Sequence, residues 1–150
     1  MTETTPPSQE QPDAPPFIFY MDGEEYLREL RTLTTWVSDL LLPLYGREAT
    51  SQQPWCPRWW EHLEAIARLH ALWLAWQECT GAAAGASGPS AWHRDHLGPA
   101  MAELRSATGP FAGCKEGGHR AKAVPAVEPY DGGNGAGGTG EPDPYEISLW

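Results

Sequence analysis

Hydrophobic residues between positions 22 and 46 recur at steps of three and four, the spacing that places side chains on one face of an α-helix. The residues of this face are Leu27, Leu30, Leu33, Val37, Leu40 and Leu44, and Trp36 and Leu41 widen it. Asp22, followed three residues later by Glu25, is typical of a helix start. Pro43 and Gly46 predict the end of the helix.

A second helix is predicted to begin in the stretch PWCPRWWEH at residues 54–62. Pro57 suits the first helical position, where its missing N–H costs nothing, and Cys56 then becomes the capping residue. In this register Trp55 and Trp60 would form a hydrophobic staple at the helix entry. The remaining tryptophan joins a broad apolar face made of Trp59, His62, Leu63, Ile66, Leu69, Trp73 and Trp76. The tryptophan cluster is therefore interpreted as helix packing.

A third helix is predicted over AWHRDHLGPAMAELRS, with Ser90 as its cap. Pro99 lies inside this helix and removes a backbone hydrogen bond, so we expect a kink or two short helices that meet at Gly98-Pro99. Its apolar side consists of Trp92, Leu97, Met101 and Leu104, and Phe111 closes the core. The fold predicted is a small all-α, three-helix domain.

Composition divides the 150-residue chain into three parts. Residues 1–16 are rich in proline, and residues 115–150 are rich in glycine and acidic until a short hydrophobic motif at the end. Neither segment can bury enough apolar surface to offset the entropy of ordering, so both are predicted to be disordered tails. Residues 17–114 are predicted to form the helical domain, with the aromatic stretch Phe17–Tyr20 packed against the helices.

The net charge of −10 is spread along the chain, without a basic face or basic block. Direct binding to nucleic acid or to a membrane surface is therefore disfavoured. The N-terminus lacks the features of a secretory signal, and the apolar runs are too short to span a bilayer. Three cysteines at no framework spacing predict reduced thiols and a cytoplasmic protein.

Three blocks of the sequence are similar to a known family. The blocks are WCPRWWEHLEAIARLHALWLAWQ, the later WHRDH, and GPFAGC. Over residues 18–119 they resemble an actinobacterial, Streptomyces-type family of short proteins with a domain of unknown function, often encoded near plasmid or integrative-element genes. The chain departs from the family pattern at His93, where a second tryptophan is common. The resemblance implies an uncharacterised bacterial protein and supplies no set of catalytic residues.

Cysteine and histidine residues suggest a metal site. Cys114 and His119 form a Cys-x4-His pair, and Cys56 could complete a set with a histidine of the His93-x2-His96 pair. Thiolate and imidazole suit tetrahedral zinc, and the predicted ligands are Cys56, His96, Cys114 and His119, with His93 as an alternative to His96. The competing interpretation makes both helical histidines ordinary residues and His119 the start of the tail.

Catalysis is not predicted. Cys56 at a helix N-terminus, with His62 or His96 as base, could form a nucleophilic pair. However, His62 falls on the predicted apolar face, and no nucleophile elbow or oxyanion loop accompanies the cysteine. The Gly-rich runs lack the strand, helix and lysine of a phosphate-binding loop. No catalytic residue is assigned.

The last five residues, Glu146–Trp150, end a glycine-rich segment with an aliphatic and aromatic cluster. They resemble the pentapeptide by which bacterial proteins dock on the replication sliding clamp, although Glu146 replaces the usual glutamine. Ile147, Leu149 and Trp150 would be the partner-binding anchors. Folding of the tail onto its own domain, or a chance match, are the alternatives.

The function predicted is a non-enzymatic protein-interaction module, an accessory protein of an actinobacterial mobile element or chromosome. Its partner is expected to be a protein, and apolar residues outside the core pattern, such as Leu74 and Trp60, would contribute to the contact surface. A zinc-stabilised helical domain and tail-mediated docking on the sliding clamp are the alternative functions.

Overall fold

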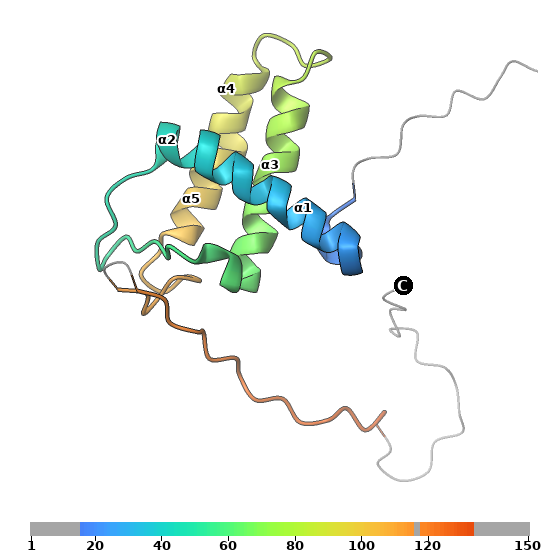
Figure 1. Ribbon diagram of the computed structural model, residues 1–150, viewed down its shortest axis with the longest axis vertical. Coiled ribbons are helices and arrows are strands. Elements are labelled where there is room, and N and C mark those ends of the chain that lie inside the picture. Colours follow the sequence, from blue (N-terminus) through green and yellow to red (C-terminus); the bar gives the residue numbers. More distant parts are fainter. Residues whose placement is uncertain (1–15, 116–117, 134–150) are drawn as a thin grey trace, which may run out of the picture.

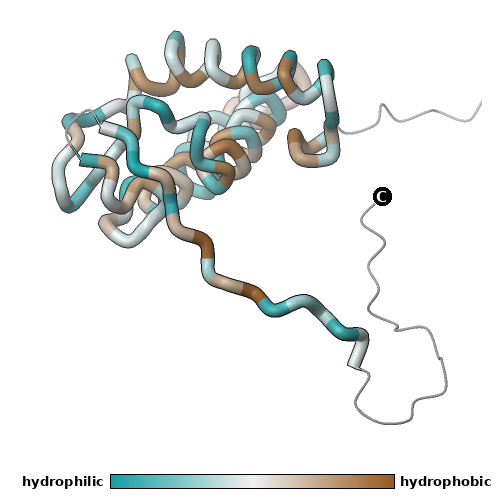
Figure 2. The backbone as a smooth tube through the Cα atoms, turned by 60° about the horizontal axis from the view of Figure 1, so that its bottom comes forward, coloured by the Kyte–Doolittle hydropathy of each residue, from teal (hydrophilic) through white to brown (hydrophobic). Residues whose placement is uncertain are grey.

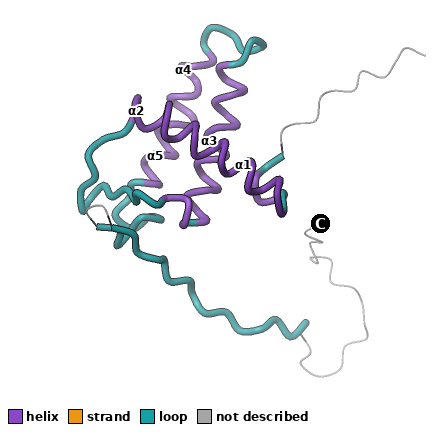
Figure 3. Tube along the Cα trace, in the orientation of Figure 1, coloured by secondary structure: helices purple, strands orange, loops and turns teal. Residues whose placement is uncertain are grey.

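The computed structural model describes residues 16–115 and 118–133, and within them every regular element is helical (Figures 1 and 3). The elements in chain order are η1 (Ile18–Tyr20), α1 (Gly23–Trp36), η2 (Val37–Leu41), α2 (Leu42–Tyr45), η3 (Trp59–Glu61), α3 (Leu63–Thr80), α4 (Gly88–Trp92), η4 (His93–Leu97) and α5 (Gly98–Leu104). The prediction of an all-α fold is confirmed.

The elements combine into three long helices. The first runs without interruption through α1, η2 and α2, the second is α3, and the third runs through α4, η4 and α5. Figure 1 shows the third helix alongside α3 and the first helix crossing over α3, and the turned view of Figure 2 shows α1 as a separate layer above the others. The three-helix domain predicted from the sequence is therefore present.

A π turn precedes a proline in both interrupted helices. In η2 the Leu42 N–H bonds to the Val37 carbonyl, and in η4 the Gly98 N–H bonds to the His93 carbonyl. Pro43 and Pro99 follow at once, each in the first turn of the next α-helix. Because proline cannot donate a hydrogen bond and crowds the carbonyl four residues earlier, the wider π turn lets each helix continue.

Both proline predictions are thereby refined. The irregularity expected at Pro99 is the π turn η4, with two helical segments joined at Gly98. The helix end predicted at Pro43 and Gly46 is found there: the first helix ends at Tyr45 with Gly46 as its C-cap residue, and Pro43 lies in the first turn of α2. A Cβ atom on Gly46 would lie 2.5 Å from the Leu42 carbonyl oxygen, so this close turn requires glycine.

The predicted start of the second helix is also wrong. His62 is the N-cap residue of α3, and its extended backbone breaks the helical register assumed from residue 57. Consequently Trp55 and Trp60 form no staple: Trp55 packs edge-on against Phe111 with ring centroids 4.9 Å apart, and Trp60 is 42% exposed. Trp59 is buried as predicted.

The core lies where the three helices meet. Within the predicted apolar face of the first helix, Leu33, Trp36, Val37 and Leu41 are buried, whereas Leu27 and Leu44 at its two ends are exposed. Trp92 is buried between α3 and the first helix and donates its indole N–H to the Leu72 carbonyl at 3.2 Å. Phe111 is buried, so it closes the core as expected.

The aromatic stretch before α1 forms a 3-10 turn that is fastened by a buried histidine. The Ile18 N–H donates to His70 Nδ1 at 3.3 Å, which leaves His70 Nε2 protonated and 2.9 Å from Glu29 Oε1. Ile18 is completely buried. One side chain of α3 therefore holds both η1 and α1.

The predicted tails, residues 1–16 and 115–150, lie for the most part outside the described residues. The described stretch 119–133 contains no helix or strand, and Figure 1 shows it running away from the helical body. Among the described helices, none is long and apolar enough to cross a membrane.

Candidate metal centre

Four cysteine and histidine side chains converge at one end of the helical body. They are Cys56, His62, Cys114 and His119, and one nitrogen or sulfur atom of each lies within 4.8 Å of those of the other three. Cys56 Sγ is 3.2 Å from His119 Nδ1, and Cys114 Sγ is 3.4 Å from His62 Nε2. The cluster thus brings two sulfur and two nitrogen atoms within 4.8 Å of one another.

Each pair of these side chains comes from a different part of the chain. Cys56 lies in the irregular segment before η3, and His62 is the N-cap residue at the start of α3. Cys114 and His119 follow α5, after the turns that begin at residue 105. Gly113, immediately before Cys114, has φ of +87°, a left-handed conformation that favours glycine and sets the direction of the chain into the cluster.

The cluster is enclosed. Cys56, His62 and Cys114 are buried, and the side chain of His119 is 15% exposed. The His62 ring packs edge-on against Phe111, with centroids 5.4 Å apart, and against His119 at 4.8 Å. Apolar packing therefore fixes the imidazole orientations and limits the access of water.

Polar groups lie beside two of the four side chains, His119 and Cys114, where an outer coordination shell would lie. Glu61 Oε2 lies 3.1 Å from His119 Nε2, the ring nitrogen that faces away from Cys56. The Arg120 N–H donates to Cys114 Sγ at 3.4 Å. Two such contacts are common around protein-bound metals: a carboxylate on the outer nitrogen of a histidine ligand, and an N–H donor to a cysteine sulfur. They fix the orientation of the ligands and adjust their basicity.

The electrostatics of the cluster favour neutral side chains at Cys56 and His62. Burial raises the pKa of the Cys56 thiol to about 11, against a hydrogen bond from the Arg58 backbone that lowers it, and the neighbouring Cys114 raises it further. Burial, followed by the charge of His119, lowers the pKa of His62. A thiol held protonated at neutral pH is a poor nucleophile, so this environment disfavours the Cys56 nucleophile considered above.

The same atoms fit a tetrahedral metal ion. With Zn–S bonds of about 2.3 Å and Zn–N bonds of about 2.0–2.1 Å, neighbouring ligand atoms around zinc lie about 3.3–3.8 Å apart. The two measured sulfur–nitrogen distances, 3.2 and 3.4 Å, are close to this range. Small movements of the side chains would admit the ion, and its double positive charge would stabilise both thiolates.

Three of the four ligands predicted from the sequence meet in this cluster, and the fourth does not. Cys56, Cys114 and His119 lie together, but His96 is exposed on η4 and is not one of the clustered residues. His93, the alternative, donates from Nδ1 to the Pro89 carbonyl at 2.6 Å and accepts the Tyr45 hydroxyl at Nε2 at 2.8 Å.

His62 takes the fourth position, and the sequence reasoning missed it because it placed this residue inside a helix on the apolar face. A signal was available. Cys56 and His62 form a Cys-x5-His pair, which parallels the Cys-x4-His pair of Cys114 and His119. Treating both pairs as half-sites would have selected the observed set. The predicted anchors Ile147, Leu149 and Trp150 lie outside the described residues.

Fold and side-chain geometry together define a small all-helical domain with a buried Cys2His2 cluster capable of holding a metal ion. Comparison with protein families places the chain further: residues 30–131 match the Domain of unknown function (DUF4913), and the chain belongs to this family. All four clustered residues fall inside the matched region. No curated protein and no solved structure matches the chain.

Proposed function

We propose that the chain is a non-enzymatic protein-interaction domain whose fold is stabilised by a zinc ion bound to Cys56, His62, Cys114 and His119. The observation that supports the zinc proposal is the convergence of these four ligand atoms within 4.8 Å, in a buried site with Glu61 behind His119. Two sulfur and two nitrogen ligands suit zinc better than magnesium or calcium, which prefer oxygen.

The site has the character of a structural rather than a catalytic zinc site. Four protein ligands fill a tetrahedral coordination sphere, whereas a catalytic zinc keeps one position for water or substrate. The ion would join the segment before α3 to the segment after α5. Both segments lie outside the three long helices, so the hydrogen bonds within those helices do not connect them. Its contribution would be to the stability of the domain.

Metal analysis and thermal unfolding test the zinc proposal directly. Protein purified without chelator should contain about one zinc per chain, since one four-ligand site binds one ion. Treatment with a strong chelator should lower the melting temperature by more than about 10 °C, and added zinc should restore it. A protein that contains no stoichiometric metal, and whose melting temperature does not change with chelator or zinc, would contradict the proposal.

The interaction proposal is supported by apolar side chains that the fold leaves on its surface. Leu27 on α1 and Trp60 on η3 are 53% and 42% exposed, and together with Leu30 they line a shallow groove. Large exposed apolar residues that gather in this way are typical of contact surfaces for other proteins. The acidic net charge, −10, does not favour nucleic acid as the partner.

An accessory role in an actinobacterial mobile element or chromosome is the biological setting proposed, on the family resemblance alone. Affinity capture from such a host, with the full chain and with a chain that ends at Gly140, tests it. We expect a replication or mobile-element protein to be captured by the full chain, and a sliding clamp to be lost on truncation if Ile147, Leu149 and Trp150 are its anchors. Capture of neither class by the full chain would contradict this setting.

A further inference from the structure

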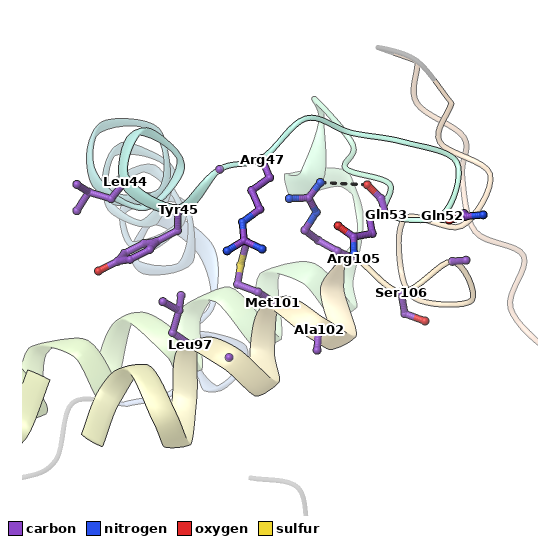
Figure 4. A pocket seen from close by; sticks show the side chains of 13 residues that line it. Leu44, Tyr45, Arg47, Gln52, Gln53, Leu97, Met101, Ala102, Arg105 and Ser106 are labelled. Atoms are coloured by element: carbon purple, nitrogen blue, oxygen red, sulfur yellow. Dashed lines mark hydrogen bonds between the residues drawn. The ribbon is translucent and has the colours of Figure 1, made fainter. Parts of the chain in front are cut away.

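A hollow of about 690 Å³ lies between the end of the first helix and the outer side of α5 (Figure 4). Its lining includes Tyr45 and Arg47 from the end of α2 and the loop after it, Leu97 and Met101 from the third helix, and Arg105, the C-cap residue of α5. This volume falls in the range of small-molecule sites, about 300–1,000 Å³. The hollow is separate from the metal cluster, with which it shares no residue.

Arg105 contributes a buried guanidinium to the lining. The residue is only 8% exposed, and its Nη2 donates to the carbonyl oxygens of Glu48 at 2.8 Å and Gln53 at 3.1 Å. Its Nε atom is buried and has no hydrogen-bond partner. In the described parts of the chain no carboxylate forms an ion pair with Arg105. A buried cation without a counter-charge carries a large desolvation cost, which an anion would offset.

Arg47 adds a second positive charge at the same place. Figure 4 shows its side chain pointing into the hollow between Tyr45 and Arg105. Within residues 16–115 and 118–133, Arg47 forms no ion pair or hydrogen bond. Burial, and after it the charge of Arg47, lowers the pKa of Arg105. None of the residues that line the hollow is acidic. The two guanidinium groups therefore create a local positive potential on a chain of net charge −10.

Apolar surface adjoins the two charges. A second hollow, of about 330 Å³, shares Gly46, Arg47, Met101 and Arg105 with the first, and its other lining residues are Leu42, Ala49, Trp55 and Pro57. A ligand with its charge on the arginines would thus have room for a hydrophobic body. Both π turns end beside this region, since Leu42, which lines the second hollow, follows η2, and Leu97, which lines the first, closes η4. Such turns are frequent at functional sites.

We propose that this hollow binds a small organic anion, with its carboxylate or phosphate group on Arg47 and Arg105 and its apolar body on Met101 and the second hollow. Arginine suits both headgroups because its planar guanidinium can donate two parallel hydrogen bonds to either. Arg105 is held by the Glu48 and Gln53 carbonyls and is therefore preorganised, and Arg47 is free to close on the ligand.

Binding of model anions to the full chain tests the proposal. Octanoate and octyl phosphate each join one of the two charged headgroups to the same octyl chain. Octanol has the octyl chain without a charged headgroup, and inorganic phosphate has the charge without the octyl chain. Titration followed by the NMR signal of the Met101 methyl group should show saturable binding of at least one octyl anion. Octanol and inorganic phosphate should bind at least about tenfold more weakly, because octanol lacks the negative charge and inorganic phosphate lacks the apolar body.

Substitution of Arg47 tests whether the anion binds in this hollow, and it leaves the buried Arg105 unchanged. Because Arg47 is exposed and forms no hydrogen bond or ion pair with the described residues, Arg47→Met should fold normally. It should weaken binding of the octyl anion by about tenfold or more, the loss expected for a charged hydrogen bond. Arg28→Met, an exposed arginine on α1, is the matched control and should bind like the original protein. Equal binding of octanol and octanoate, no saturable binding of either anion at millimolar concentration, or equal weakening by the two substitutions would overturn the proposal.

Discussion

Replacement of Cys114 by serine is expected to destabilise the domain by about 3 kcal/mol or more if the proposed zinc ion is bound, because a hydroxyl cannot replace the thiolate in a four-ligand site whose metal contributes to the free energy of folding. Cys114 is buried beside His62, and the change removes no large apolar group, so packing loss alone would be small. Urea unfolding of the zinc-loaded proteins, followed by tryptophan fluorescence, measures the difference in the free energy of unfolding.

Cys79→Ser is the matched control. Cys79 is a partly buried cysteine near the end of α3 and does not belong to the cluster. The same chemical change there should cost less than about 1 kcal/mol, and chelator should lower the melting temperature of this variant as it does that of the original protein. If both variants lost equal stability, or if Cys114→Ser kept its full response to added zinc, the four-residue site would be disproved.

Truncation of Trp92 to alanine is expected to cost about 3–5 kcal/mol, the range for a buried tryptophan whose removal leaves a cavity. Trp92 is buried where α3, the first helix and the third helix meet, and its ring lies 5.7 Å from that of Tyr45. The change also leaves the Leu72 carbonyl without the indole donor. The expected result in urea is a large fall in the midpoint with little change in the slope of the transition.

Trp60→Ala provides the comparison for that measurement. Trp60 is 42% exposed on η3, so removal of its side chain should change the free energy of unfolding by less than about 1 kcal/mol. Similar losses in the free energy of unfolding for Trp92→Ala and Trp60→Ala would show that Trp92 makes no special contribution to the stability of the core. A normal stability of Trp60→Ala together with weakened partner binding would instead support the surface proposed for interaction.

The helical pattern predicted the fold because most of the core is built by α-helices that obey the 3.6-residue period. Leu33, Trp36 and Val37 on the first helix were identified in this way. The prediction was wrong where side-chain chemistry overrides the period. The predicted second helix began at residue 57, but α3 begins only at Leu63. The segment before it, residues 56–62, has the cluster residues Cys56 and His62 at its two ends.

Long-range contacts account for the rest of what the sequence could not reveal. His70 fits the apolar face of α3, but its partners Ile18 and Glu29 lie 52 and 41 positions away. Similarly, the environment of Arg105 depends on the Glu48 and Gln53 carbonyls, which a loop brings to it from 57 and 52 positions away. Sequence spacing indicates only which residues are neighbours along one helix or strand. It therefore could not predict the hydrogen bond between His70 and Ile18 of η1, or the proximity of Arg47 and Arg105.

The two Cys/His pairs are far apart in the chain: 52 positions separate His62 from Cys114, and 63 separate Cys56 from His119. In a short zinc finger the ligands are sequence neighbours, so the ion can organise an otherwise unfolded peptide. Here we expect the ligands to meet only after α3 and the third helix have docked, because closing so long a loop beforehand carries an entropic penalty without compensating contacts. Zinc at this site would therefore be captured late in folding, and it would govern how long the native state lasts more than how fast it forms.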